Sequence, residues 1–424
     1  MRILLASFGS YGDLNPYLGL GRALQAQGHQ PALAVPRLYQ PLVESAGLEW
    51  RPIRPDGDPS DRAVVSRIMD PVRGPEYLIR QLMMPNLRDM YDDLDAACED
   101  ADLVVSHPLT FAAPVLCEKR GLPWASSVLA PLSFFSRRDP PLALPGPMSA
   151  AIHRKWPKAL SPVNTFGLSL TRYWTREVRD LRHALGLPKG QNPVGSGQFS
   201  PLLTVAMFST ALATPQSDWP RHTVVTGAVR YDGIHGAMSP ELNEFLDSGP
   251  PPIVFTLGSA AVATSRAAHF YEISVAAATA MGCRSVLLVG RDPLNRPTVV
   301  AGDVFVTEWA PHSELFPRAA AIVHQGGAGT LHTALESGRP MLVVPFAHDQ
   351  PDNAARAERL GVARVIYPEQ YSAKRVRLAL QALLSDPDVR ENAAAVSERV
   401  RAEDGAWSAA TAISQLASHV PYSS

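Results

Sequence analysis

The sequence has few cysteines, almost no net charge and no long apolar run. Its 424 residues include only three cysteines, Cys98, Cys117 and Cys283, with no Cys-x-x-Cys pair and no Cys/His cluster. This argues against a disulfide framework and a zinc site, and it predicts a reducing, cytoplasmic location. The 39 basic and 40 acidic residues give a net charge of -1. The chain therefore lacks the cationic excess typical of nucleic-acid-binding proteins.

No run of 18 or more uncharged apolar residues is present, so we predict no transmembrane helix. The first apolar run, residues 3–8, is too short for the core of a signal peptide. A hydrophobic content of 46% argues against disorder. The 39 prolines and 29 glycines separate apolar runs, as turns between short elements do.

The first 50 residues predict a strand, a turn, a helix and a second strand. Residues 3–8 are continuously apolar, which is typical of a parallel strand buried on both faces. A helix with Pro16 in its first turn is expected to place Leu20 and Leu24 on one face. Residues 32–35 form the second strand. This order predicts an α/β protein with a doubly wound parallel sheet.

Later apolar runs predict two α/β units of similar size. Residues 135–200 interrupt the strand pattern and predict helices joined by loops. Further strands are expected at 103–106, 124–128, 223–225, 253–257, 286–289, 304–306, 321–323 and 341–344. The domains we predict are an N-terminal Rossmann-like domain at 1–226, a proline-containing linker at 227–252, a C-terminal Rossmann-like domain at 253–405 and a closing helix at 406–424.

The most informative segment is a glycine-rich turn between a strand and a helix, His324-Gln325-Gly326-Gly327-Ala328-Gly329-Thr330. The first turn of a helix leaves backbone N–H groups unpaired and carries partial positive charge. Glycine lets a phosphate approach that backbone closely, and His324 and Thr330 add side-chain donors. The segment predicts a cradle for a phosphate or diphosphate, with a tight turn of small residues as the alternative.

Three motifs follow one another here: Trp309-Ala310-Pro311, then His-x-Gly-Gly-x-Gly-Thr from residue 324, then Asp-Gln-x-x-Asn from residue 349. Together they resemble the donor-binding motifs of the family-one glycosyltransferases, which use nucleotide sugars and have the GT-B fold. The details are most similar to the bacterial rhamnolipid and natural-product branch. The opening Gly-Ser-x-Gly-Asp-x-x-Pro and the two-domain pattern extend the resemblance over nearly the whole chain. It implies two Rossmann-like domains facing a cleft.

The resemblance also implies roles for the matching residues. Trp309 would stack on the nucleobase, and Asp349 and Gln350 would bind sugar hydroxyls. The implied donor-binding residues are Gly258, Ser259, Trp309, His312, His324, Gly326, Gly327, Gly329, Thr330, Asp349 and Gln350. Three of them have ordinary structural alternatives: Trp309 as a core aromatic residue, and Asp349 and Ser259 as helix caps.

Two positions depart from the family pattern. His312 stands where the plant enzymes have a glutamine. His332 stands where many members carry a ribose-binding glutamate, and Glu336 follows one turn later. These departures leave both uridine and thymidine diphosphate sugars open as donors, and both glucose and a deoxysugar such as rhamnose.

Asp13 is the main candidate for a catalytic base. It follows a buried strand in a turn flanked by glycine, so its carboxylate is expected at the cleft, where it would take a proton from an acceptor hydroxyl. Burial in an apolar cleft would raise its pKa. The alternative is a cap for a helix beginning near Pro16, although Asn15 is also available as that cap. His107, in a turn after another strand, would orient Asp13 or contact the acceptor, or make only local bonds.

Three phenylalanines, Phe134, Phe135 and Phe166, are candidates to line an acceptor site, with core packing as the alternative. The apolar content of residues 109–135 predicts a hydrophobic acceptor, such as a polyphenol or flavonoid, a lipid or a polyketide. Residues 150–190 are rich in Lys and Arg and include aromatic residues. This segment would contact an anionic membrane or a carboxylated acceptor; the alternative is a solvated helical face. The oligomeric state is left open.

The function predicted is inverting transfer of a sugar from a UDP- or dTDP-sugar cosubstrate to a small-molecule hydroxyl. No resident cofactor or metal is expected, since this arrangement of donor, acceptor and base requires none. Two alternatives remain: a nucleotide-sugar epimerase on the same two-domain plan, and a non-catalytic nucleotide-sugar-binding protein. An NAD oxidoreductase is disfavoured because Gly9-x-x-Gly12 lacks the GxGxxG spacing.

Overall fold

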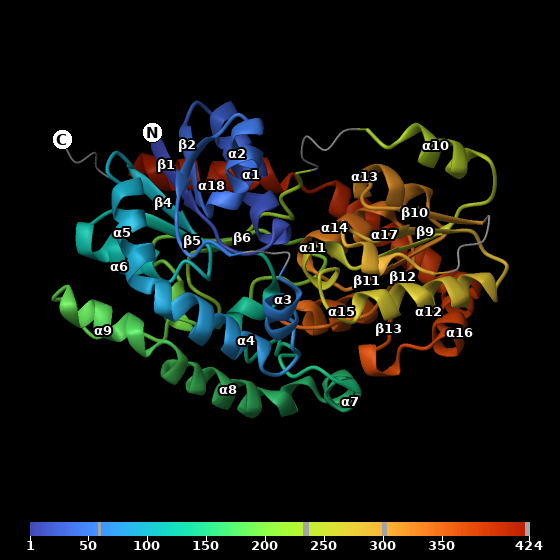
Figure 1. The fold of residues 1–424 in the computed structure, drawn as a ribbon. Helices are drawn as coiled ribbons and strands as arrows, with labels where there is room; N and C mark the ends of the chain where they lie inside the picture. Colours follow the sequence, from blue (N-terminus) through green and yellow to red (C-terminus); the bar gives the residue numbers. More distant parts are fainter. Residues whose placement is uncertain (58–60, 232–236, 299–302, 420–424) are drawn as a thin grey trace.

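Two parallel β-sheets lie side by side in the computed structural model, each covered by helices on both faces (Figure 1). The structure describes residues 1–57, 61–231, 237–298 and 303–419. The first sheet has the order β3-β2-β1-β4-β5-β6-β7 and the second has the order β10-β9-β8-β11-β12-β13. The strands of the first sheet are β1 (Arg2–Ala6), β2 (Gln30–Val35), β3 (Glu49–Pro52), β4 (Leu103–Ser106), β5 (Trp124–Val128), β6 (Thr204–Ala206) and β7 (Thr223–Val225). Those of the second are β8 (Ile253–Thr256), β9 (Ser285–Leu288), β10 (Val304–Thr307), β11 (Ala321–His324), β12 (Met341–Val343) and β13 (Ala363–Val365).

The helices of the first half include several short ones and a row of three at the edge of the molecule. They are α1 (Tyr11–Ala26), α2 (Gln40–Ser45), α3 (Arg62–Ile68), α4 (Gly74–Tyr77), α5 (Leu87–Ala97), α6 (Ala112–Arg120), α7 (Pro147–Lys155), α8 (Ser161–Trp174) and α9 (Arg176–Ala184). Those of the second half are α10 (Pro240–Asp247), α11 (Gly258–Ala261), α12 (Ala267–Thr279), α13 (His312–Leu315), α14 (Ala328–Ser337), α15 (Gln350–Arg359), α16 (Ala373–Ser385), α17 (Pro387–Arg401) and α18 (Gly405–His419). Within the described residues, none of these helices combines the length and the apolar character needed to cross a bilayer.

The predicted α/β architecture with two parallel sheets is confirmed. All the predicted strands form, and none of their ends is shifted by more than two residues. Three strands were missed: β3, β6 and β13. The sequence of β3 is Glu-Trp-Arg-Pro, which has no apolar run, and β6 and β13 have only three residues each. Their strand conformation depends on pairing with a neighbour already in the sheet.

Each sheet has a point at which the chain order reverses. In the first sheet β1 lies between β2 and β4, with Ala6 opposite both Ala34 and Ser106. In the second sheet β8 lies between β9 and β11. At such a point the two connections leave for opposite faces of the sheet and a crevice remains at the carboxyl ends of the strands. The turns after β1, β4, β8 and β11 are therefore the natural sites for ligands.

The ends of the two halves are interlaced. Helix α10 lies within the predicted linker, 227–252, yet its Leu242 and Leu246 are buried in the core of the second half. Residues 232–236 of that linker lie outside the described part of the chain. The closing helix α18 returns to the first half, where Ala410 and Ile413 pack in the same core as Leu18 of α1. Residues 420–424 of the predicted closing segment are likewise not described.

Helix α3 extends from the first half and packs against the second. Its Val65 is buried in the core that includes Phe270 of α12. At the start of the helix, the Arg62 Nη1 atom lies 2.6 Å from Asp292 Oδ2, and its Nη2 atom donates to the Thr264 carbonyl at 2.9 Å. Apolar and charged contacts thus join the two halves at α3.

A buried ion-pair network joins the halves on another side. The guanidinium of Arg356 in α15 is only 2% exposed and pairs with Asp139 at 2.5 Å and with Asp352 at 2.7 Å. The second oxygen of Asp352 accepts the Leu142 N–H at 2.9 Å. A buried charge is costly unless it is paired and hydrogen-bonded, and each group here meets that condition.

Candidate functional site

The first element of the site is the turn between β1 and α1, which holds the Asp13 carboxylate. Ser10 is the N-cap of α1, and Asp13 is its third residue. Asp13 Oδ2 accepts the Ser10 N–H at 2.7 Å and the Ser10 hydroxyl at 3.1 Å. The Ser10 Oγ atom in turn accepts the Gly12 N–H at 3.2 Å, so side chains and backbone at this helix end form a capping box. The predicted start of this helix near Pro16, with Asn15 as a possible cap, was wrong. Asp13 therefore does not cap a helix beginning near Pro16; its Oδ2 atom takes part in the cap of a helix that begins at Tyr11, and its Oδ1 atom takes no part in that cap.

Gly9 makes this arrangement possible. Its φ of 137° lies in the region that favours glycine, and a Cβ at this position would lie 2.3 Å from Asp13 Oδ2. The Gly9 carbonyl accepts the Tyr39 hydroxyl at 2.7 Å, which fixes the turn from the other side. The position of the Asp13 carboxylate is therefore defined by the backbone of Gly9 and Ser10.

His107, in the turn after β4, faces the other oxygen of Asp13. The Leu109 N–H donates to His107 Nδ1 at 3.2 Å, so the neutral imidazole carries its proton on Nε2. That atom lies 3.6 Å from Asp13 Oδ1. His107 is thus placed to orient Asp13, and it also lines the cavity described below, where an acceptor could contact it.

The charge state of Asp13 differs from the expectation. Burial raises its pKa, but the contacts with His107 and Ser10 outweigh burial and hold the pKa of Asp13 below its ordinary value. The predicted rise in pKa was therefore wrong. Asp13 is ionised at neutral pH and able to accept a proton.

The second element of the site is the start of α14, which follows β11. Gly327 is the N-cap, and the first N–H bonded within the helix is that of Leu331, to the Gly327 carbonyl. The N–H groups of the first turn therefore point out of the helix end. A Cβ on Gly329 would meet no atom within 4 Å, so the space beside this turn is open. Thr330 lies at the same end. These features match an anion cradle.

His324 does not belong to this cradle. It is fully buried, its Nδ1 atom accepts the Gly326 N–H at 3.1 Å, and its Nε2 atom lies 3.4 Å from Met341 Sδ. Burial lowers the pKa of His324 to about 3, so the imidazole is neutral. The expectation that His324 and the Gly326 N–H hold a diphosphate is corrected, because both are used to fix the turn. Asn353 completes this support by donating to the Gly326 carbonyl at 2.9 Å.

Gln325 is a site residue that the sequence reasoning missed. Its carboxamide is wedged between two turns: a Cβ on Gly258 would lie 2.2 Å from Gln325 Nε2, and one on Gly327 would lie 2.9 Å from it. Gln325 Oε1 is buried and forms no hydrogen bond with any residue that the structure describes. Gly258, with φ 62°, and the exposed Ser259 thus border the same space as the α14 turn. The unpaired atom was not visible from the sequence because it depends on the close approach of β8 and β11.

Asp349 lies at the start of α15, and its Oδ2 atom accepts the Asn353 amide at 2.8 Å. Burial and the negative charge of Asp13 raise the pKa of Asp349 to about 7, although the bond from Asn353 opposes this. The effect of Asp13 places its charge near the Asp349 carboxyl, although the two residues belong to different halves. Gln350 differs from its predicted role, because its Oε1 atom accepts the N–H groups of Phe346 and Ala347 and so braces the loop.

A second missed residue, His348, precedes Asp349 and has a φ of 58°, which is uncommon for a residue with a side chain. Burial lowers its pKa, while the charge of Asp13 and a hydrogen bond to the Ile68 backbone act in the opposite direction. His348 therefore lies where α3, the Asp13 turn and the Asp349 loop meet. Its backbone conformation carried no sequence signal, since non-glycine residues rarely adopt it.

The nucleobase end of the predicted site lies at the carboxyl end of β10. The Trp309 side chain is 44% exposed, so it is not the core aromatic residue that was the alternative. His312 stacks on Phe316 with ring centroids 4.4 Å apart, and burial lowers its pKa to about 4. The His312 side chain near the predicted nucleobase site is therefore uncharged at neutral pH.

The two residues considered for ribose binding make other contacts. His332 donates to the Ala328 carbonyl at 2.7 Å through Nδ1 and accepts the Ser209 N–H at 3.1 Å through Nε2. Glu336 pairs with Arg230 at 2.8 Å. Both side chains therefore join α14 to segments outside the second sheet.

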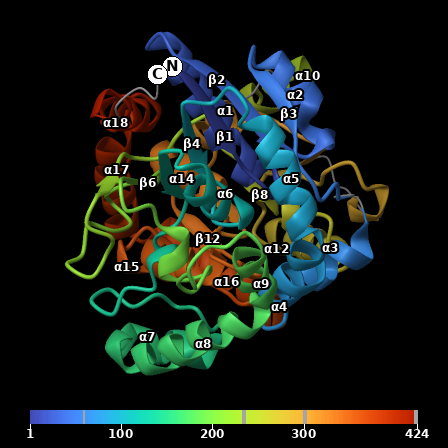
Figure 2. The same ribbon diagram turned by 90° about the vertical axis from the view of Figure 1, so that its left-hand side faces the viewer.

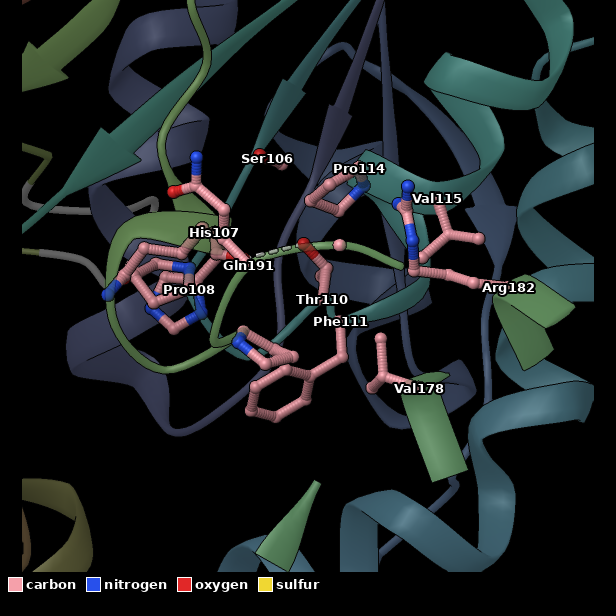
Figure 3. A pocket seen from close by; sticks show the side chains of 14 residues that line it. Ser106, His107, Pro108, Thr110, Phe111, Pro114, Val115, Val178, Arg182 and Gln191 are labelled. Carbon is pink, nitrogen blue, oxygen red and sulfur yellow. Dashed lines mark hydrogen bonds between the residues drawn. The ribbon is translucent and has the colours of Figure 1, made fainter. Parts of the chain in front are cut away.

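A cavity in the first half opens beside His107, between β4, α6 and α9 (Figure 3). It is lined by both apolar and polar side chains, among them Pro108, Phe111, Val178, Thr110 and Gln191. The phenylalanines predicted to bind the acceptor are not among its lining residues.

Each of those phenylalanines has another environment. Phe134 is buried and stacks on Trp219 with ring centroids 4.0 Å apart. Phe166 is 64% exposed on α8, and Phe135 is a partly buried residue with φ 46° at the end of a short helical turn. The core alternative is thus correct for Phe134. Among the described residues, no three His, Cys, Asp or Glu side chains form a group that could hold a metal ion.

Comparisons with known proteins show what the whole chain is similar to. Residues 280–415 match the family model described as erythromycin biosynthesis protein CIII-like, C-terminal domain. The chain is 32% identical to the O-mycaminosyltylonolide 6-deoxyallosyltransferase of Streptomyces fradiae, with 98% of each chain covered. Among solved structures, the glycotransferase of kitacinnamycin superposes with a TM-score of 0.75 at 23% identity, and 98% of each chain is covered. The glycosyltransferase VinC, in complex with dTDP, gives a TM-score of 0.68 at 19% identity, covering 99% of this chain and 100% of that one.

Proposed function

Because this chain belongs to the family-one glycosyltransferases of the GT-B fold that act on natural products, we propose that it moves a deoxysugar from a dTDP-sugar to a hydroxyl of an apolar natural product. Two findings support this choice of donor. The 32% identical relative is named a 6-deoxyallosyltransferase, and a structural neighbour holds dTDP. We include inversion at the anomeric carbon and a cytoplasmic location in the proposal.

One observation carries it. The Asp13 carboxylate of the first half lies close enough to Asp349 of the second half that its charge raises the pKa of Asp349. Each of these residues borders the carboxyl edge of its own sheet, where ligands of such folds bind. An acceptor bound to the first half would therefore meet a donor sugar bound to the second.

The chemistry follows from these positions. A hydroxyl oxygen of the acceptor attacks the anomeric carbon while Asp13, ionised and oriented by His107, takes its proton. The bond from the anomeric carbon to the diphosphate oxygen breaks on the opposite face. The unpaired N–H groups at the start of α14, with Thr330, stabilise the charge that leaves with the diphosphate. His324 supplies no charge in this scheme.

The residues fit the two ends of such a donor. Trp309 offers an exposed aromatic face to a nucleobase, and Asp349, protonated below about pH 7, can donate to a sugar hydroxyl. The cavity beside His107, with Phe111 and Val178 in its wall, supports an apolar acceptor.

The experiment is mass spectrometry of products from a matrix of dTDP-deoxysugars, dTDP-glucose and UDP-glucose against polyketide, sterol and flavonoid alcohols. We expect one glycoside, formed fastest with a dTDP-deoxysugar and an apolar polyketide alcohol. The β- or α-configuration of the product, determined by NMR, has to be opposite to that of the donor.

The same matrix addresses the two other readings of the sequence. Conversion of the donor sugar in the absence of any acceptor would indicate an epimerase. Tight donor binding with no product from any acceptor would indicate a binding protein. Preference for UDP-glucose would contradict the donor proposed here while leaving sugar transfer intact.

A further inference from the structure

Helix α8 exposes its apolar side to solvent, whereas a surface helix of a globular protein normally buries that side. Val163, Phe166, Leu170 and Tyr173 follow one another at intervals of three or four residues and are 38–78% exposed. Helical residues at this spacing lie on one face. This apolar stripe therefore points away from the protein.

The inward face of α8 carries buried polar side chains along its middle, and Trp174 at its end packs against the apolar core of the first half. Asn164 is buried and donates to the Pro141 carbonyl at 2.8 Å. Thr171, also buried, accepts from the Asn192 amide at 2.9 Å, and that amide also donates to the Leu168 carbonyl. The helix is thus held to the protein by hydrogen bonds, which leaves its apolar face without a covering layer.

Helix α7, next to α8 (Figure 1), also exposes apolar residues. Trp156, immediately after it, is 65% exposed, and Met148 in its first turn is 79% exposed. Figures 1 and 2 show α7 and α8 in a row at the margin of the molecule, outside both sheets. We call the exposed apolar residues of this surface the α7–α8 face: Met148, Trp156, Val163, Phe166, Leu170 and Tyr173.

The charge of this segment has one sign. Between Asp139 and Glu177 the sequence contains no acidic residue, and five Arg and Lys residues, Arg154, Lys155, Lys158, Arg172 and Arg176. Lys155 and Lys158 are exposed, and neither forms an ion pair with any residue in the described part of the chain. The Lys155 ammonium lies 6.0 Å from the centre of the Trp156 ring.

We propose that the α7–α8 face docks on an anionic lipid bilayer. Exposed apolar patches on soluble proteins mark interaction sites. Aromatic rings flanked by Lys and Arg are suited to a membrane interface, where the rings enter the headgroup region and the cations meet the lipid phosphates. Arg154 pairs with Glu358 and Arg176 with Glu177, which leaves Lys155, Lys158 and Arg172 without an ion pair to any described residue. A symmetric contact with a second copy would bring these three positive charges against the same three, which opposes that occupant.

The test is co-sedimentation of the full chain with extruded vesicles of 70:30 phosphatidylcholine:phosphatidylglycerol and of phosphatidylcholine alone. We expect binding to the anionic vesicles at least tenfold tighter than to the neutral ones, and several-fold weaker in 500 mM than in 50 mM NaCl. Equal binding to both vesicle types, or none to either, overturns the proposal.

Two pairs of substitutions separate the apolar and charged contributions. Trp156→Ser with Tyr173→Ser, and Lys155→Gln with Lys158→Gln, are each expected to weaken binding to the anionic vesicles at least tenfold. Because all four side chains are exposed, circular dichroism and the thermal midpoint are expected to match the wild type. Matched exposed controls away from this face are Leu294→Ser with Trp407→Ser, and Lys374→Gln with Arg375→Gln.

A loss as large in these controls as in the α7–α8 variants contradicts a localised docking face. Sedimentation equilibrium tests the other occupant. A wild-type dimer that the Trp156→Ser, Tyr173→Ser pair converts to a monomer would assign this face to a second copy and overturn the lipid proposal.

Discussion

The Nε2 atom of His107 lies 3.6 Å from Oδ1 of Asp13, while Oδ2 of the same carboxylate accepts two hydrogen bonds from Ser10. The two oxygens thus have different tasks. Oδ2 anchors the side chain to the start of α1. Oδ1 faces the Nε2 atom of His107, which carries the proton of the neutral imidazole. A carboxylate fixed in this way is positioned before any acceptor arrives, which lowers the cost of reaching the transition state.

Replacement of the proposed base comes first. Asp13→Asn is expected to lower kcat by roughly 10²–10⁴-fold, because the amide cannot accept the hydroxyl proton. Binding of dTDP, measured by calorimetry, is expected to change little. Ser10→Ala is the control, since it removes a capping bond at a cost of about 1 kcal/mol while the carboxylate remains. Near-normal transfer by Asp13→Asn would exclude it as the base.

The role of His107 is visible in a pH profile. His107 lowers the pKa of Asp13, so His107→Gln is expected to raise that pKa and to reduce the ionised fraction at acid pH. The acid limb of kcat/KM then moves to higher pH, with about 10-fold lower kcat at its plateau. A lower kcat with an unshifted acid limb would assign His107 to acceptor contact instead of orientation of Asp13.

Asp349 makes stability depend on pH. Its carboxyl has a pKa of about 7 when folded, against an ordinary value of 3.8. Between these values the unfolded chain loses the proton and the folded protein keeps it, so the contribution of Asp349 to stability falls as the pH rises from about 4 to 7. Relative to wild type, Asp349→Asn is expected to gain ~1–2 kcal/mol at pH 8 and little at pH 4.

Urea denaturation at a series of pH values measures this difference. Asp303→Asn, at an exposed position, is the control and is expected to show no gain that grows with pH. A constant offset between Asp349→Asn and wild type at all pH values would mean that the carboxyl ionises alike in both states.

Gly9 and Gly28 form a matched pair of positive-φ glycines. A Cβ on Gly9 would lie 2.3 Å from Asp13 Oδ2, whereas one on Gly28 would meet no atom within 4 Å. Alanine at either position costs about 1 kcal/mol of backbone strain. Gly9→Ala is also expected to displace Asp13 and lower kcat/KM by roughly tenfold or more. Equal losses of activity in both variants would show that strain alone is responsible.

Arg62 tests the contact between α3 and the second half. Arg62→Ala removes the 2.6 Å ion pair with Asp292, and we expect a higher KM for the donor and faster hydrolysis of the sugar nucleotide in the absence of acceptor, because water enters a less closed cleft. Arg80→Ala is the control, since its 2.6 Å pair with Glu76 lies within the first half. Unchanged hydrolysis in Arg62→Ala would remove α3 from cleft closure.

Apolar runs and glycine-rich turns were sufficient to predict most of the fold. A strand of a parallel sheet is buried on both faces, so continuous apolar runs such as 103–106 and 253–257 can be recognised as strands. Two turns were predicted on the same basis, the one that carries Asp13 and the one at residues 324–330. In each, an apolar run is followed by small residues and then by a helical pattern, which predicts a strand, a tight turn and a helix. Helix α10 was missed because its apolar face is short and follows proline-rich linker sequence.

The sequence by itself thus determined the two parallel sheets, the family resemblance and the position of Asp13 at a sheet edge. Only the tertiary structure brought His107 beside Asp13, because β1 and β4 are neighbours in the sheet and not in the chain. It also made His324 a neutral, buried support and Gln325 the residue between two turns, since both depend on how closely β8 and β11 approach. Local propensity determines where helices and strands form. The burial and the charge of a side chain depend instead on neighbours that are distant in the sequence.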